Sequence, residues 1–137
     1  MMMRSMKLMS ALVVLLFTAS AFVQNDGLPK SITRGKDLYV TNCMNCHMDN
    51  GKGMEGVYPP LAKSDFLKRP AKDIIETVLK GQSGEVKVNG VVYNAVMPAQ
   101  DYLTDAEIAD ILNYVNNSWG NKNPKAITPA QVKKLRP

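Results

Sequence analysis

Both cysteines and the only histidine of this 137-residue chain lie within five consecutive residues, Cys43-Met44-Asn45-Cys46-His47. Two thiols separated by two residues match the fixed distance between the two vinyl groups of a haem, and the next residue directs its imidazole toward the iron. Cys-x-x-Cys-His is the attachment signature of c-type haem. The pentapeptide therefore predicts one haem c, bound covalently through Cys43 and Cys46, with His47 as a ligand of the iron.

Three other uses of these residues fit the sequence less well. A thioredoxin-like dithiol is the main alternative, but it requires a strand before the motif and a βαβ context, which the flanking sequence lacks. A disulfide between Cys43 and Cys46 would close too small a loop to add much stability. Two cysteines and one histidine do not supply the four protein ligands of a closed structural zinc site.

The composition fits one globular domain. Apolar residues make up 45% of the chain and charged residues 21%, which excludes a disordered or collagen-like protein. The formal net charge of +5 is mild and spread along the chain, so it gives no argument for nucleic acid as a partner.

The N-terminus resembles an export signal. Arg4 and Lys7 form a positively charged region, residues 8–17 are apolar, and Ala19-Ser20-Ala21 offers the small residues of a cleavage site. We therefore expect a cleaved signal peptide over residues 1–21 and a periplasmic protein. A retained N-terminal membrane anchor is the alternative, although the apolar run is short for a full span; an internal core helix is a third interpretation.

The rest of the chain is expected to be mainly α, with a linker over residues 22–31, one domain over 32–120 and a C-terminal extension over 121–137. Helices are predicted over about 33–43, 70–79 and 104–117, and a last short helix after Thr128. The helix at 104–117 starts with a Thr104/Glu107 capping box. Residues 48–64 are expected to form an irregular loop, and residues 85–93 a β-hairpin that turns at Asn89-Gly90.

A second axial ligand of the iron has to come from a residue other than histidine, because His47 is the only one. Met44, Met48 and Met54 stand close to the attachment site and would have to reach around the edge of the ring. Met97 follows 50 residues after His47, far enough for the chain to wrap the haem and approach its other face, and Pro98 stiffens its loop. Met97 is therefore the preferred ligand, and a Met97 that only fills the core is the alternative.

Over about residues 32–119 the chain resembles the class I, mono-haem c-type cytochromes of the small bacterial kind. The residues that carry the resemblance are Gly35 and Tyr39, the pentapeptide, Asp49-Asn50-Gly51-Lys52-Gly53, Tyr58-Pro59-Pro60-Leu61, Met97-Pro98 and the helix that ends at Trp119. The resemblance implies a cytochrome c fold with three to five helices wrapped around one haem. The hairpin at 85–93 and the tail after Trp119 depart from the simplest members; the hairpin would shield the haem edge or shape a docking surface.

The resemblance also implies specific contacts. The first helix would cross the helix predicted at 104–117, with Gly35 and Tyr39 packing on Ile111 and Tyr114. A proline carbonyl would accept a hydrogen bond from the His47 ring, which fixes the orientation of the imidazole and raises its basicity. The spacing to Leu61 places this bond on Pro59, with Pro60 as the alternative, so that Pro59 and Leu61 are expected beside the haem.

An iron bound by both His47 and Met97 has no free position for a substrate, so we expect an electron carrier and not an enzyme. A five-coordinate haem that binds a gas or peroxide is the alternative, and a haem-free dithiol protein is a third. A monomer without a membrane span after signal cleavage is expected, with an oxidase, reductase or dehydrogenase as redox partner. Five cations near the attachment loop form either a docking patch or a solvated face: Lys52, Lys63, Lys68, Arg69 and Lys72.

Overall fold

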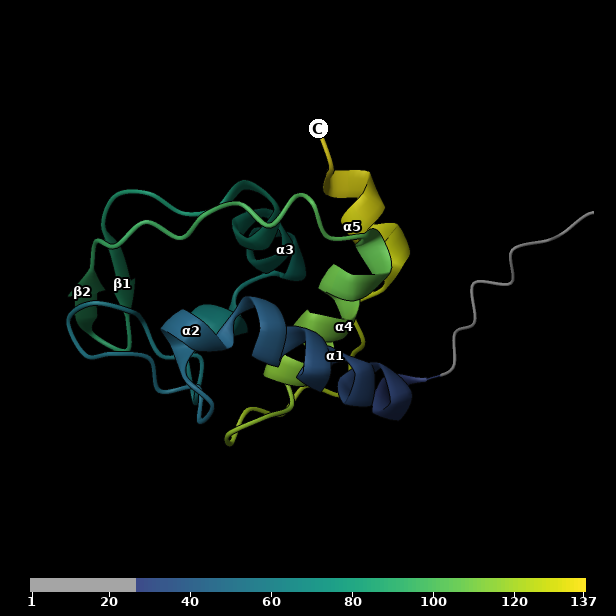
Figure 1. Cartoon of the computed structure of the whole chain (residues 1–137), viewed down its shortest axis with the longest axis horizontal. Coiled ribbons are helices and arrows are strands. Elements are labelled where there is room, and N and C mark those ends of the chain that lie inside the picture. The colour runs from purple at the N-terminus through teal and green to yellow at the C-terminus, as the bar shows by residue number, and fades with distance from the viewer. Residues whose placement is uncertain (1–26) are drawn as a thin grey trace, which may run out of the picture.

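The computed structural model describes residues 27–137, and the predicted export signal at residues 1–21 lies outside the described residues. Within them the chain forms five α-helices, one 3-10 helix and one two-stranded antiparallel sheet (Figure 1). The elements are α1 (Leu28–Asn42), α2 (Met44–His47), η1 (Asp65–Lys68), α3 (Ala71–Lys80), β1 (Val86–Val88), β2 (Val91–Tyr93), α4 (Asp105–Val115) and α5 (Pro129–Leu135). The predicted mainly α architecture with a small hairpin is confirmed.

Gly35 allows α1 to cross α4 at very short range. A Cβ atom at this position would lie 1.9 Å from the carbonyl oxygen of Asp110 and 2.8 Å from the Cβ atom of Tyr114. Beside this crossing, the ring centroid of Tyr39 lies 5.4 Å from that of Tyr114 and 5.0 Å from that of Trp119. The expected crossing of α1 over α4 is therefore present, with Gly35 and Tyr39 both packed on Tyr114, and it extends to Trp119 beyond the end of α4.

The first turn of α1 is held by polar contacts. The helix begins at Leu28, earlier than the predicted start near residue 33, so residues 28–31 are helical although the sequence placed them in a linker. The buried Ser31 hydroxyl donates to the Asp110 carboxylate over 2.6 Å, and Arg34 pairs with the same carboxylate at 2.6 Å. Apolar periodicity missed this turn because its inward contacts are made by a hydroxyl and a guanidinium.

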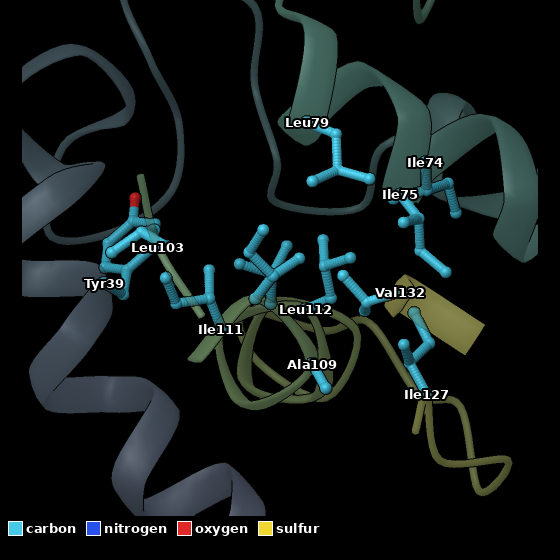
Figure 2. Close-up of a cluster of buried hydrophobic side chains, with 12 residues drawn as sticks. Tyr39, Ile74, Ile75, Leu79, Leu103, Ala109, Ile111, Leu112, Ile127 and Val132 are labelled. Atoms are coloured by element: carbon cyan, nitrogen blue, oxygen red, sulfur yellow. The ribbon is translucent and has the colours of Figure 1, made fainter. Parts of the chain in front are cut away.

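The hydrophobic core lies between α3, α4 and α5. Figure 2 shows Ile75 and Leu79 of α3 on the side of the helix that faces Leu112 of α4 and Val132 of α5, and Ile74 belongs to the same cluster of buried side chains. Val132 has no exposed surface, and Ile75 is 1% exposed. Helix α5 therefore contributes to the same core as the central helices.

A buried asparagine ties the C-terminal segment to α4. The Asn113 side chain, 2% exposed, donates through Nδ2 to the Ile127 carbonyl over 2.9 Å and accepts from the Ile127 amide over 2.7 Å. Directly after Ile127, Thr128 and Gln131 form a capping box that begins α5. The short terminal helix that the sequence predicted is therefore present.

The other helices and the hairpin lie close to the ranges predicted from the sequence. The Thr104/Glu107 capping box begins α4, and the hairpin turns at residues 89–90, with Val86 paired to Tyr93. Helix α3 is displaced by one residue from the predicted range 70–79, and η1 was not predicted. Among residues 27–137, none of the helices has the length and apolar character that crossing a bilayer requires.

Candidate functional site

The attachment pentapeptide forms a separate helical turn at the end of α1. Cys43 interrupts the helix, and its carbonyl accepts the amide of His47 over 3.0 Å, so that α2 starts at Met44. Both cysteines are free thiols and half-buried. Burial, with a smaller contribution from nearby Cys46, raises the pKa of the Cys43 thiol to about 11, so this thiol is protonated at neutral pH.

Tyr39 fixes the end of this turn. Its ring is 1% exposed, and its hydroxyl donates to the carbonyl of Met48 over 2.6 Å, at the residue where α2 ends with a φ of 63°. Burial raises the pKa of Tyr39 well above its usual value, so the hydroxyl keeps the proton that it donates. The tyrosine thereby connects the crossing of α1 and α4 to the segment that carries the cysteines.

His47 is oriented by a backbone carbonyl. Its side chain lies 9% exposed, and its Nδ1 is 3.0 Å from the Pro59 carbonyl oxygen. Because a carbonyl only accepts, Nδ1 carries the proton, which leaves the lone pair on Nε2. Burial lowers the pKa of His47 and the Pro59 bond opposes this shift, so the ring is neutral at pH 7. A neutral imidazole with a free Nε2 is the form that binds a metal.

The loop after α2 brings the Pro59 carbonyl to His47. Gly53 has a φ of 63°, and a Cβ atom there would lie 2.3 Å from the carbonyl oxygen of Tyr58 and 2.7 Å from that of Pro59. The Gly53 amide donates to the His47 carbonyl over 3.0 Å, and the Leu61 amide donates to the Gly51 carbonyl over 2.7 Å. The loop is therefore ordered by its own backbone, and the hydrogen bond that the resemblance implied lies on Pro59 and not on Pro60.

Met97 stands on the segment that joins β2 to α4, which crosses above α2 in the view of Figure 1. Two backbone hydrogen bonds of 2.9 Å pair Met97 with Gln82, one in each direction. A Cβ atom at Gly81 would lie 2.4 Å from the Met97 carbonyl oxygen, so the close approach requires glycine there. The end of α3 therefore fixes the backbone that carries the thioether.

A single open cavity brings the predicted site residues together. The empty space within it is about 1020 Å³ when the open solvent at its mouth is included. Its lining is almost entirely apolar and includes Cys43, Cys46, His47, Pro59, Leu61 and Met97. Of the four methionines among the described residues, Met97 alone lines it, whereas Met44, Met48 and Met54 do not.

This cavity fits a haem by its chemistry. A haem is a flat and mostly apolar ring with an iron at its centre, and a concave, mostly apolar lining with a few polar groups is typical of cofactor sites. Two free thiols and a neutral imidazole come from the α1–α2 side, and a thioether comes from the segment after β2. Among residues 27–137 no group of three or more His, Cys, Asp or Glu side chains is placed to hold a metal ion.

The hairpin closes one side of the cavity. Val86 and Val88 of β1 line it, and Val88 is 2% exposed. At the turn, Asn89 and Asp65 exchange two hydrogen bonds of 2.9 Å, each between a backbone amide and a side-chain oxygen. We call this pair the Asp65–Asn89 clasp. The sequence identified Asn89 as a turn residue, but a bond to a residue 24 positions away leaves no local pattern.

Comparisons with known proteins show what the whole chain is similar to. The sequence model of the family described as Cytochrome c matches residues 32–119. A cytochrome c-552 of Thermus thermophilus is 36% identical over 127 residues, which covers 87% of this chain and 85% of the relative.

Two further matches cover only part of a larger protein. The cytochrome c subunit of the quinone alcohol dehydrogenase of Gluconobacter oxydans is 29% identical over 103 residues, 74% of this chain and 22% of that subunit. The CcoP subunit of the cbb3-type cytochrome c oxidase of an Azospirillum species is 34% identical over 99 residues, 66% of this chain and 30% of the subunit.

Proposed function

The chain belongs to the cytochrome c family, whose members transfer electrons, and on this premise we propose that it carries single electrons on one haem c. The haem would be attached through the Cys43 and Cys46 thiols, with His47 and Met97 as the two axial ligands. One observation supports this assignment above the others. All four side chains line the same apolar cavity, and Met97 is the only methionine of the described residues that does so.

The side chains of the site have distinct tasks in this proposal. His47 would bind through Nε2, because its Nδ1 proton is held by the Pro59 carbonyl 3.0 Å away. That hydrogen bond raises the basicity of the ring and fixes its plane. Met97 would bind through its neutral sulfur, and the paired backbone of Gln82 limits how far the sulfur can withdraw.

The bound haem supplies the chemistry, a one-electron cycle between Fe(II) and Fe(III). The chain determines how that cycle is used. If His47 and Met97 both held the iron, no position would be left for a substrate, which favours a carrier over an enzyme. Thioether ligation raises the reduction potential relative to two histidines, and the apolar lining acts in the same direction because it excludes water.

Redox proteins are the proposed partners. Relatives named as cytochrome subunits of dehydrogenases and of an oxidase support this class. The N-terminal export signal predicted over residues 1–21 supports a periplasmic location. We propose that the protein acts there as a monomer. All five cations of the predicted docking patch are exposed or partly exposed: Lys52, Lys63, Lys68, Arg69 and Lys72.

A spectroelectrochemical titration of the holoprotein, followed by exposure of the reduced form to carbon monoxide, tests this function. We expect a reversible one-electron transition and a reduced spectrum that carbon monoxide leaves unchanged. Haem that stays with the protein through acid-acetone extraction would support attachment at Cys43 and Cys46. Rapid carbon monoxide binding would instead favour a five-coordinate haem that binds gases or peroxide.

A further inference from the structure

Three polar side chains lie together between the end of α1 and the segment that carries Met97. The Tyr102 hydroxyl lies 2.7 Å from Gln100 Oε1 and 3.1 Å from Asn42 Oδ1. Asn42 is the last residue of α1, next to Cys43, whereas Gln100 follows Met97 on the segment between β2 and α4. We call Asn42, Gln100 and Tyr102 the strap.

Gln100 is the buried centre of the strap. Gln100 is only 8% exposed, and both polar groups of its side chain form hydrogen bonds. Oε1 accepts from Tyr102, and Nε2 donates to the Pro98 carbonyl over 3.1 Å. The Gln100 amide also donates to the Val78 carbonyl of α3 over 2.9 Å. Pro98, the residue after Met97, therefore accepts a hydrogen bond from the Gln100 side chain, and the same side chain accepts one from Tyr102.

Tyr102 is exposed, which is unusual for a group that bridges two elements. The residue is 67% exposed, so packing contributes little to its position. Its hydroxyl has one proton and two acceptors, and the shorter distance is to Gln100. The hydroxyl therefore donates to Gln100 on its own segment or to Asn42 on α1, one at a time. The strap is a polar contact at the surface, and it can open without disrupting the hydrophobic core.

We propose that Gln100 and Tyr102 are positioning residues for the Met97 thioether, and that the strap keeps the Met97 segment closed over the haem. This inference rests on the proposed ligation of the iron by Met97. On this proposal the segment opens transiently, and an added ligand would reach the iron only from the open arrangement. The apparent affinity for that ligand rises with the open fraction, so it measures how firmly the strap closes the segment.

Imidazole binding to the ferric holoprotein tests the proposal. Imidazole competes with Met97, and its binding is followed by the loss of the weak far-red band of thioether-bound iron. Tyr102→Phe removes one hydroxyl, and we expect about fivefold tighter imidazole binding, the effect of one ordinary hydrogen bond. Gln100→Ala should have a larger effect, and adding Tyr102→Phe to it should change little, because the two residues act through the same link.

Asp101→Asn provides the matched control, since Asp101 is exposed between the two strap residues and its side chain makes no hydrogen bond among the described residues. It should bind imidazole like the wild type. Wild-type imidazole affinity in both Tyr102→Phe and Gln100→Ala, with the far-red band present, would overturn the strap alone. If Gln100→Ala does not fold, the imidazole affinity of Tyr102→Phe alone tests the strap. A wild-type protein without the band would refute Met97 ligation and the strap with it.

Discussion

Gly35 and Asp110 meet so closely that the backbone of α1 touches the backbone of α4, with space for a hydrogen atom and not for a methyl group. This contact determines the distance between the helix that leads into the cysteines and the helix whose Ile111, Leu112 and Val115 line the cavity. The crossing therefore connects the stability of the fold to the shape of the site.

Gly35→Ala is expected to lower the free energy of unfolding by about 2 kcal/mol or more. A Cβ atom 1.9 Å from the Asp110 oxygen forces the helices apart, and overpacking of this kind outweighs the roughly 1 kcal/mol that alanine gains in a helix. Denaturant unfolding of the holoprotein measures the change. Lys36→Ala, at the next and exposed position of α1, should stay within about 0.5 kcal/mol of the wild type. Equal stability of Gly35→Ala and wild type would contradict the close crossing.

The Asp65–Asn89 clasp should hold the hairpin against the cavity. Asn89→Gly keeps the positive φ that the turn requires but removes the side-chain partner, so we expect faster amide hydrogen exchange over residues 86–93 and a loss of about 1–2 kcal/mol. Asp65→Ala on top of Asn89→Gly should cause a further loss, because it removes the second bond, from the backbone amide of residue 89 to the Asp65 carboxylate, which Asn89→Gly leaves in place. Lys87→Ala, an exposed change on β1, is the control. Unchanged exchange in Asn89→Gly would show that the hairpin does not depend on the clasp.

Glu107 makes the stability of α4 depend on pH. Its carboxylate accepts from the Thr104 amide over 2.8 Å and from the Thr104 hydroxyl over 2.9 Å, and these bonds lower its pKa in the folded protein. A group with a lowered folded pKa stabilises the protein above its unfolded pKa, about 4.3, and loses this contribution as the pH falls through the folded value.

Glu107→Gln should therefore be less stable than the wild type at pH 7, and the difference in melting temperature should shrink as the pH falls below about 4. Parallel thermal melts of the two proteins measure it. The same exchange at Glu55, which is exposed and makes no hydrogen bond among the described residues, controls for the loss of one charge. A difference for Glu107→Gln that stays constant from about pH 7 to about pH 3 would exclude this role.

A chain that cannot attach haem is expected to fold poorly. In Cys43→Ser/Cys46→Ser the apolar lining of the cavity would face water, because Leu61, Val78 and Val86 line it and are only half-buried by the chain itself. We expect helical far-ultraviolet signal without a fixed near-ultraviolet signal, and binding of a hydrophobic dye. A cooperative thermal transition like that of the holoprotein would show that the protein core is sufficient alone.

Much of the fold could be predicted from the sequence because its signals are local. The capping boxes at Thr104 and Thr128 mark the starts of α4 and α5, and the Asn89-Gly90 pair marks the turn of the hairpin. The start of α1 was misplaced because its first turn is stabilised by a hydrogen bond from Ser31 to Asp110, which lies on another helix.

The residues of the site also differ in how far the sequence predicts them. Cys43, Cys46 and His47 are recognisable because the chemistry of attachment fixes their spacing. The roles of Gln82 and Gly81 at Met97, and of Gln100 and Tyr102 in the strap, depend on contacts between segments distant in the chain or on side-chain geometry. Such contacts have no periodicity, so only the three-dimensional structure shows them.

The far-red absorption of the ferric holoprotein tests the central claim most directly. Wild-type protein should show the weak charge-transfer band of iron bound to a thioether, and Met97→Ala should lose it and bind carbon monoxide once reduced. Met54→Ala, an exposed methionine that does not line the cavity, should keep the band. A wild-type spectrum without the band, or a band that persists in Met97→Ala, would contradict His47/Met97 ligation and with it the proposal of a saturated electron carrier.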